Sequence, residues 1–215
     1  IDTQCHFREP GGEHKETLET GTKSAALGGI VGIFEMPNTN PLTVTPEAME
    51  FKLKRASETA YVDYAFYFGG TAENSSNLSE WENLKGVCGI KIFMGSSTGS
   101  LLSATDAEID KIFANGKRVV AVHAEDEAMM NENKITILKD SNDVKMHNIW
   151  RSEESCFNAT KRVVSIAKKY NRPVHVLHIT TAQEFDYLRE NKDVACVEVL
   201  PNHLTMHAPD CYEEK

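Results

Sequence analysis

Short apolar stretches rich in β-branched and aromatic residues alternate along this chain with longer stretches of helical periodicity. The strand-like stretches span residues 1–7, 32–36, 62–68, 87–93, 118–123, 174–179 and 195–200. The helix-like stretches span residues 15–27, 46–59, 106–114, 152–170 and 181–190. Residues 126–150 are polar and irregular, which predicts a long connection with one helical turn or more. This alternation is typical of parallel strands joined by crossover helices.

Two α/β architectures fit the pattern: an open doubly wound sheet, and a (β/α)8 TIM-like barrel. A nucleotide-binding sheet carries a G-x-G-x-x-G turn after its first strand. Here that turn, residues 8–12, reads REPGG, so the barrel is favoured. No boundary rich in proline, glycine or serine divides the chain, and residues 1–215 are expected to form one domain.

The length bears on how much of a barrel is present. A closed (β/α)8 barrel typically needs about 250 residues, whereas this chain has 215 and begins within the first strand-like stretch. We therefore expect an incomplete barrel with strands 1 to 7 and without the eighth, belonging to a longer protein.

Composition excludes several classes of partner. The net charge is -9 and the pI is near 5.4, without a cluster of basic and aromatic residues, so nucleic acid and anionic membranes are not expected partners. No apolar run approaches the roughly 20 residues of a membrane span. The 5 cysteines are scattered and form no Cys-x-x-Cys pair, which argues against disulfides and favours a cytoplasmic location.

Residues that bind metals or anions recur at the carboxyl ends of successive strand-like stretches, where a barrel places its active site. They are His6, Arg8, Asn38, Lys91, His123 and His178. Each is weak evidence alone, and His6 by itself would more often be a core or surface histidine. Their recurrence at the same end of consecutive strands is what indicates a site.

Lys91 is the least ordinary of these residues because it lies within the apolar stretch GIKIFM. An unpaired ammonium is costly to bury, so the lysine must find a partner, lose its proton or be modified. A neutral lysine reacts with carbon dioxide to give a carbamate whose two oxygens can bridge metal ions. The alternative is an edge lysine whose head remains in solvent.

His123 and His178 each follow an apolar run that a barrel would bury, and zinc readily accepts imidazole ligands. His175 precedes His178 by an odd number of residues, so only one of the two should face the barrel interior. We predict that His178 faces inward and that His175 faces the helices.

These segments resemble the dihydroorotases of the amidohydrolase superfamily, in order and over essentially the whole chain. Residues 1–11, IDTQCHFREPG, resemble the opening D-x-H-x-H-F-R-E-P-G motif, and residues 36–41, MPNTNP, resemble M-P-N-T-x-P. The stretch GIKIFMGSSTG at 89–99 resembles the lysine-bearing strand, and VHAED, HVLHIT and VEVLPNHL follow in the order of the family.

The resemblance implies a zinc-dependent hydrolase of cyclic amides that interconverts N-carbamoyl-L-aspartate and dihydroorotate in pyrimidine synthesis, by metal-activated hydroxide attack. It implies that His6 binds one zinc ion, that a carboxylated Lys91 bridges two, and that His123 and His178 hold the other. Arg8 and Asn38 would bind the substrate carboxylate, which suits a guanidinium fork and an amide donor. The alternative for Arg8 is a surface ion pair with Glu9 or Glu13.

The chain departs from the family pattern at two points. Gln4 stands where the motif has its first histidine, and an amide is a poorer zinc ligand than imidazole. The chain could therefore bind one zinc ion or two. The proton-transferring aspartate of the D-H-A-P segment has no counterpart, because Met206 precedes His207 in a segment expected to be the loop after strand seven. We expect that aspartate beyond Lys215.

Two other functions remain open. A hydantoinase, dihydropyrimidinase or allantoinase would share the barrel, the metal and the lysine, although Arg8 and Asn38 favour a substrate with a free carboxylate. A catalytically inactive dihydroorotase-like partner subunit is kept open by Gln4. The resemblance also suggests a homodimer.

Overall fold

Among the described residues, seven parallel strands, hydrogen-bonded in chain order, form the centre of the molecule. The computed structural model describes residues 1–95, 101–139, 141 and 143–213. The strands are β1 (Asp2–Cys5), β2 (Gly32–Glu35), β3 (Asp63–Gly69), β4 (Val87–Phe93), β5 (Val120–His123), β6 (Val174–Val176) and β7 (Ala195–Val197). The last part of the GIKIFMGSSTG stretch, 96–99, lies outside the described residues.

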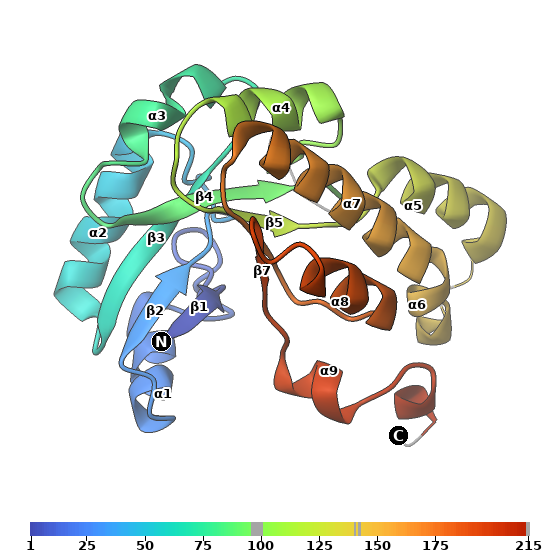
Figure 1. Cartoon of the computed structure of the whole chain (residues 1–215). Helices are drawn as coiled ribbons and strands as arrows, with labels where there is room; N and C mark the ends of the chain where they lie inside the picture. The colour runs from blue at the N-terminus through green and yellow to red at the C-terminus, as the bar shows by residue number, and fades with distance from the viewer. Residues whose placement is uncertain (96–100, 140, 142, 214–215) are drawn as a thin grey trace.

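Helices cover the outer side of the curled sheet (Figure 1). The connecting helices are α1 (Leu18–Leu27), α2 (Pro46–Thr59), α3 (Leu78–Trp81), α4 (Asp106–Ala114), α7 (Glu153–Tyr170) and α8 (Ala182–Arg189). The connection after β5 contains α5 (Glu127–Asn133) and α6 (His147–Trp150), and α9 (Pro201–Thr205) follows β7. None of the helices in the described ranges is both long and apolar enough to cross a membrane.

Side-chain alternation along the strands separates two faces. Ile90, Ile92, Val174 and Val176 lie in the core cluster that also contains residues of α4, α7 and α8. Residues of opposite parity, such as Lys91, therefore face the concave inner side of the sheet.

The two ends of the sheet approach each other. Thr3 Oγ1 in β1 donates a hydrogen bond of 3.3 Å to Glu198 Oε2, which directly follows β7. A strand order that follows the chain, together with this closure, confirms the barrel over the doubly wound sheet. The structure contains strands 1 to 7 of that barrel, as predicted.

The bounds of α2, α4 and β4 are those expected from the sequence, while β6 and β7 are shorter. The residues after β7 form α9 and a short turn of 3-10 helix at Asp210–Tyr212. Residues 207–209, HAP, lie between α9 and this turn and outside any strand, and the His207 side chain is 82% exposed.

Candidate active site

The loops that follow β1 and β2 lie against each other. Asn40 N donates to Pro10 O at 2.9 Å. Gly11 has φ 91, and a Cβ at this position would lie only 2.4 Å from Asn40 O, so only glycine fits there. The same two loops are also joined by His6 Nδ1, which donates to Asn38 Oδ1 at 2.9 Å. That bond leaves His6 Nε2 with its lone pair and Asn38 with its amide donors.

Lys91 is fully buried on the inner face of β4, with 0% exposure. Its Nζ donates to Ile92 O at 2.8 Å and lies 3.8 Å from the centroid of the Phe93 ring. Within the described residues, no carboxylate forms an ion pair with it. Burial holds the pKa of Lys91 well below its ordinary value, which favours the neutral amine.

His123 and His178 meet at the ends of β5 and β6. His123 Nδ1 lies 2.9 Å from His178 Nε2. His178 reaches this position because its backbone is left-handed, with φ 42, and because its N–H donates to Glu198 Oε1 at 3.2 Å. The two rings therefore present nitrogens to the same point.

A carboxylate and a guanidinium support His123 from the side. His123 Nε2 donates to Glu125 Oε2, and Arg151 Nε donates to Glu125 Oε1 at 2.8 Å. Burial raises the pKa of Glu125, but the hydrogen bonds from His123 and Arg151 outweigh burial and lower it to about 2. The carboxylate thus fixes the proton of His123 on Nε2 and leaves the lone pair on Nδ1, the atom that faces His178 Nε2.

Electrostatics place Lys91 and the three histidines in one neighbourhood. Burial lowers the pKa of His6 to about 4 and that of His178 to about 3, and it also lowers the pKa of His123. In each case the protonated form of Lys91 would lower the pKa further. Neutral imidazole is the form that binds metals.

The neutral imidazoles of His6, His123 and His178 are donors that zinc accepts. Within the described part of the chain, no three side chains of histidine, cysteine, aspartate or glutamate are arranged to hold a metal. Gln4 Oε1, at the position of the missing histidine, is buried and has no hydrogen-bond partner among these residues, so it is available as an oxygen donor.

One sequence prediction is wrong: His175 does not face the helices. Its neighbours Val174 and Val176 occupy the helix-facing core, so His175 points to the inner side, where it contacts Cys196 Sγ at 3.1 Å and Glu198 Oε2 at 3.2 Å. Strand alternation does not extend from His175 to His178, because β6 ends at Val176 and the left-handed backbone at His178 turns its side chain inward as well.

Glu9 and Glu13, the ion-pair partners considered for Arg8, are bonded to other groups. Glu9 accepts from Arg55 Nε and from Leu18 N, and Glu13 accepts from Gly11 N at 2.9 Å. Arg8 has φ 62, and its charge lowers the pKa of His6. It therefore lies at the same end of the sheet as His6.

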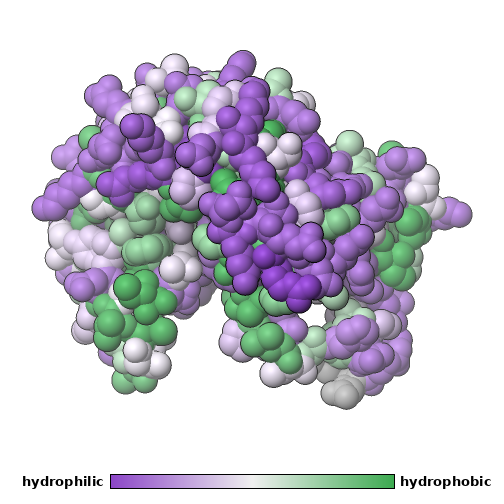
Figure 2. All heavy atoms as spheres, viewed as in Figure 1, coloured by the Kyte–Doolittle hydropathy of each residue, from purple (hydrophilic) through white to green (hydrophobic). Residues whose placement is uncertain are grey.

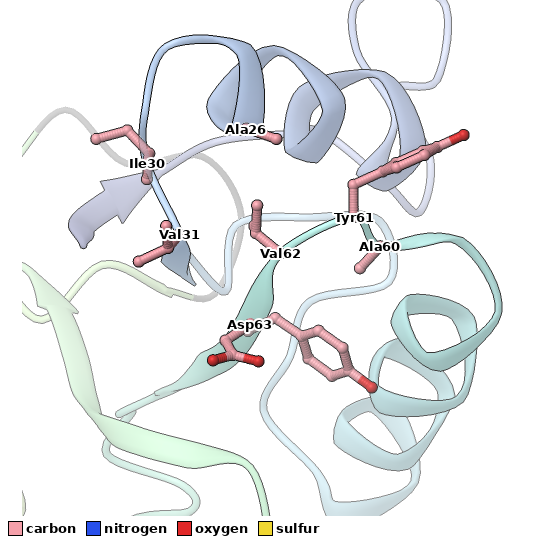
Figure 3. A pocket seen from close by; sticks show the side chains of 8 residues that line it. Ala26, Ile30, Val31, Ala60, Tyr61, Val62 and Asp63 are labelled. Carbon is pink, nitrogen blue, oxygen red and sulfur yellow. The ribbon is translucent and has the colours of Figure 1, made fainter.

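A cavity of about 520 Å³ lies at the opposite end of the strands (Figure 3). It is lined by residues before β2 and β3 and by the end of α1, including Ala26, Ile30, Val31 and Tyr61. Hydrophobic surface also gathers in this region, over the end of α1 and the N-terminus (Figure 2), where Leu27 is 84% exposed. This cavity is separate from the cluster around Lys91.

Solved structures with this fold are amidohydrolase barrels. An L-hydantoinase (dihydropyrimidinase) from Arthrobacter aurescens matches with a TM-score of 0.92 and 25% identity, over 99% of this chain and 49% of that chain. A D-hydantoinase matches with a TM-score of 0.85 and 26% identity, over 100% and 48%. The fold is thus the (β/α)8 barrel of the amidohydrolase type.

Sequence comparison narrows this class. The family model described as dihydro-orotase-like matches residues 1–161. A dihydroorotase from Thermococcus kodakarensis is 33% identical over 214 residues, covering 98% of this chain and 46% of that protein. One from Ehrlichia canis is 34% identical over 215 residues, covering 98% and 47%. The chain belongs to the dihydro-orotase-like family, as its motifs predicted, and it spans about half the length of the curated relatives it matches.

Proposed function

We propose that this chain supplies the metal-binding and carboxylate-binding residues of a dihydroorotase, which interconverts N-carbamoyl-L-aspartate and (S)-dihydroorotate in pyrimidine biosynthesis. The observation that carries the proposal is the buried Lys91, without a carboxylate partner among the described residues, in the same neighbourhood as His6, His123 and His178. Residues 1–215 belong to one barrel domain of a cytoplasmic protein, which acts as a homodimer on a small-molecule substrate.

Zinc is the metal that suits this donor set, with His6, His123, His178 and Lys91 as ligands. The neutral Lys91 amine attacks carbon dioxide, forming a carbamate N–C bond and releasing a proton, and the product offers two oxygens. When bound, zinc acidifies water and polarises the amide carbonyl. Whether one or two ions bind depends on Gln4, whose Oε1 supplies a neutral oxygen in place of an imidazole.

Arg8 and Asn38 bind the free carboxylate of the substrate. The guanidinium offers paired N–H donors, and the Asn38 amide adds a neutral donor once its Oδ1 is occupied by His6. Hydrolysis adds water across the ring amide, so that the C–N bond breaks and a second carboxylate forms. We assign no residue of the described ranges to proton transfer in this step.

Metal analysis of the purified full-length protein and its Lys91→Ala variant tests the site. We expect the parent protein to contain zinc. The Lys91→Ala variant should lose zinc that Lys91 binds, and its turnover of dihydroorotate should fall at least about 100-fold. A parent that folds but holds no zinc and turns over no dihydroorotate would instead identify an inactive partner subunit.

A second candidate is a hydantoinase or dihydropyrimidinase, favoured by the TM-score of 0.92 to the Arthrobacter aurescens structure. Substrate preference separates the two functions, because dihydrouracil and hydantoins lack the carboxylate that Arg8 and Asn38 would bind. We expect kcat/KM to be higher for dihydroorotate than for dihydrouracil or allantoin. The opposite order would exclude the dihydroorotase.

A further inference from the structure

Two cations one turn apart on α2, Lys52 and Arg55, reach the loops that follow β1 and β2. Lys52 has a 1% exposed side chain and pairs with the equally buried Glu35, the last residue of β2. Arg55 is 36% exposed at its side chain and pairs with Glu9. No contact of either cation with Lys91, His123 or His178 is found among the described residues, and their partners lie close in sequence to Arg8 and Asn38.

The Lys52 and Glu35 pair engages the backbone of both loops. Lys52 Nζ also donates to Met36 O at 3.0 Å, two residues before Asn38. The backbone N–H of Phe7 lies near Glu35 and lowers the pKa of that carboxyl, although burial, the larger effect, raises it. Phe7 lies between His6 and Arg8, so the buried pair is bonded to the loop after β2 at Met36 and lies beside the loop after β1 at Phe7.

Arg55 acts on the same loop from its other side. Its partner Glu9 directly follows Arg8 and also accepts from Leu18 N, at 2.7 Å, at the start of α1. The loop after β1 is therefore held between α1 and α2 at Glu9, and at Phe7 it lies beside Glu35 of β2. The left-handed backbone of Arg8, with φ 62, lies between these two positions.

We infer that Lys52 and Arg55 are positioning residues that set the relative placement of Arg8 and Asn38 for a substrate carboxylate. A buried ion pair is weak support for stability, since apolar residues of similar volume often serve a helix face as well. The directed bonds to Met36 and Glu9 account for two cations on the face of α2 that packs toward the sheet. This inference rests on the proposed function of Arg8 and Asn38.

The experiment replaces Lys52 with methionine in the full-length protein, and it measures steady-state kinetics with dihydroorotate and amide hydrogen exchange. Because Arg8 and Asn38 would lose their mutual placement, we expect KM to rise about tenfold while kcat changes less than about threefold. Zinc content should stay at the parent level. Exchange should accelerate in peptides that cover residues 6–12 and 36–41.

The matched control is Arg172→Met, which removes an equally buried cation of the pair with Glu82. This variant loses stability without contact to either loop, so its KM and its exchange in 6–12 and 36–41 should equal those of the parent. If Lys52→Met does not fold, Arg55→Leu at its half-exposed position takes its place, with the same direction of change in KM and exchange.

The two arms separate this inference from the proposed function. An active parent whose KM and loop exchange are unchanged in Lys52→Met, or in Arg55→Leu where that variant replaces it, would overturn the inference. A parent that does not hydrolyse dihydroorotate would overturn the proposed function, and the exchange arm would still decide whether α2 holds the two loops.

Discussion

Lys91 and Lys52 show at the scale of single residues how a partner decides the role of a buried charge. Both side chains are almost fully buried, and burial lowers the pKa of both. Lys52 has Glu35 within ion-pair distance, whereas Lys91 has only the carbonyl of Ile92 and the face of Phe93 among the described residues. The sequence pointed to Lys91 because it interrupts an apolar strand, but Lys52 lies in a charged helical stretch and gave no such signal.

His175 carries a prediction about pH. Burial alone would lower its pKa, but the contacts with Cys196 and Glu198 outweigh burial and raise it from 6.5 to about 9. A raised pKa means that the folded protein holds the proton more tightly, so this stabilisation is complete below pH 6.5 and is lost as the pH rises through 9. In chelator-treated protein, the free energy of unfolding should fall by on the order of 2 kcal/mol over this interval relative to His175→Gln.

Urea denaturation at several pH values measures the difference. His207→Gln is the control, because His207 has an 82% exposed side chain and should leave the pH profile unchanged. Parallel profiles for the parent and His175→Gln would contradict the pairing with Glu198.

At the scale of elements, local signals explain which bounds were predictable. Threonine caps and first-turn residues define the starts of α2 and α4, where Thr45 and Thr105 accept from backbone N–H groups. The sequence does not predict where β6 and β7 end. Apolar residues continue past Val176 and Val197, although the backbone leaves the sheet at those residues. The inward position of His175 was missed for this reason.

Gly21 in α1 gives a prediction at this scale. A Cβ at Gly21 would lie 2.4 Å from Cδ1 of Phe7, the residue between His6 and Arg8. Gly21→Ala should therefore displace the Phe7 ring and cost about 1–3 kcal/mol through overpacking, which exceeds the gain of up to about 1 kcal/mol in helix propensity. Thermal denaturation measures the change in stability, and kcat/KM for dihydroorotate should fall with it.

Gly28→Ala is the matched control at the end of the same helix. Its Cβ would meet only Ala25 O and Ser24 O, each at 3.5 Å, which is ordinary contact. Its stability should stay within about 0.5 kcal/mol of the parent. Equal effects of the two substitutions would argue against close packing of Phe7 on α1.

At the scale of the whole molecule, the barrel separates the site from much of its structural support. The location of His6, Lys91, His123 and His178 in or directly after parallel strands, toward their carboxyl ends, was predictable from the apolar stretches that precede them. Their supporting contacts were not, since Arg151 reaches Glu125 and Glu198 reaches His178 from segments distant in sequence. Such pairs depend on how far the sheet curls, which hydrophobic periodicity does not encode.

Arg172 lies before β6, at the amino end of the strands, and its guanidinium joins several elements there. It pairs with Glu82 at 2.9 Å and donates to the carbonyls of Ile112, Asn115 and Arg118, each at 2.8 Å. Arg172→Met would leave these buried carbonyls without their donors and Glu82 without its cation, so the free energy of unfolding should fall by about 3–5 kcal/mol. Because the residues proposed to bind substrate lie at the carboxyl ends of the strands, KM for dihydroorotate should not change. Denaturant titration and steady-state kinetics on the same preparation test both parts, and a raised KM with unchanged stability would show that the two ends of the barrel are not separate in this way.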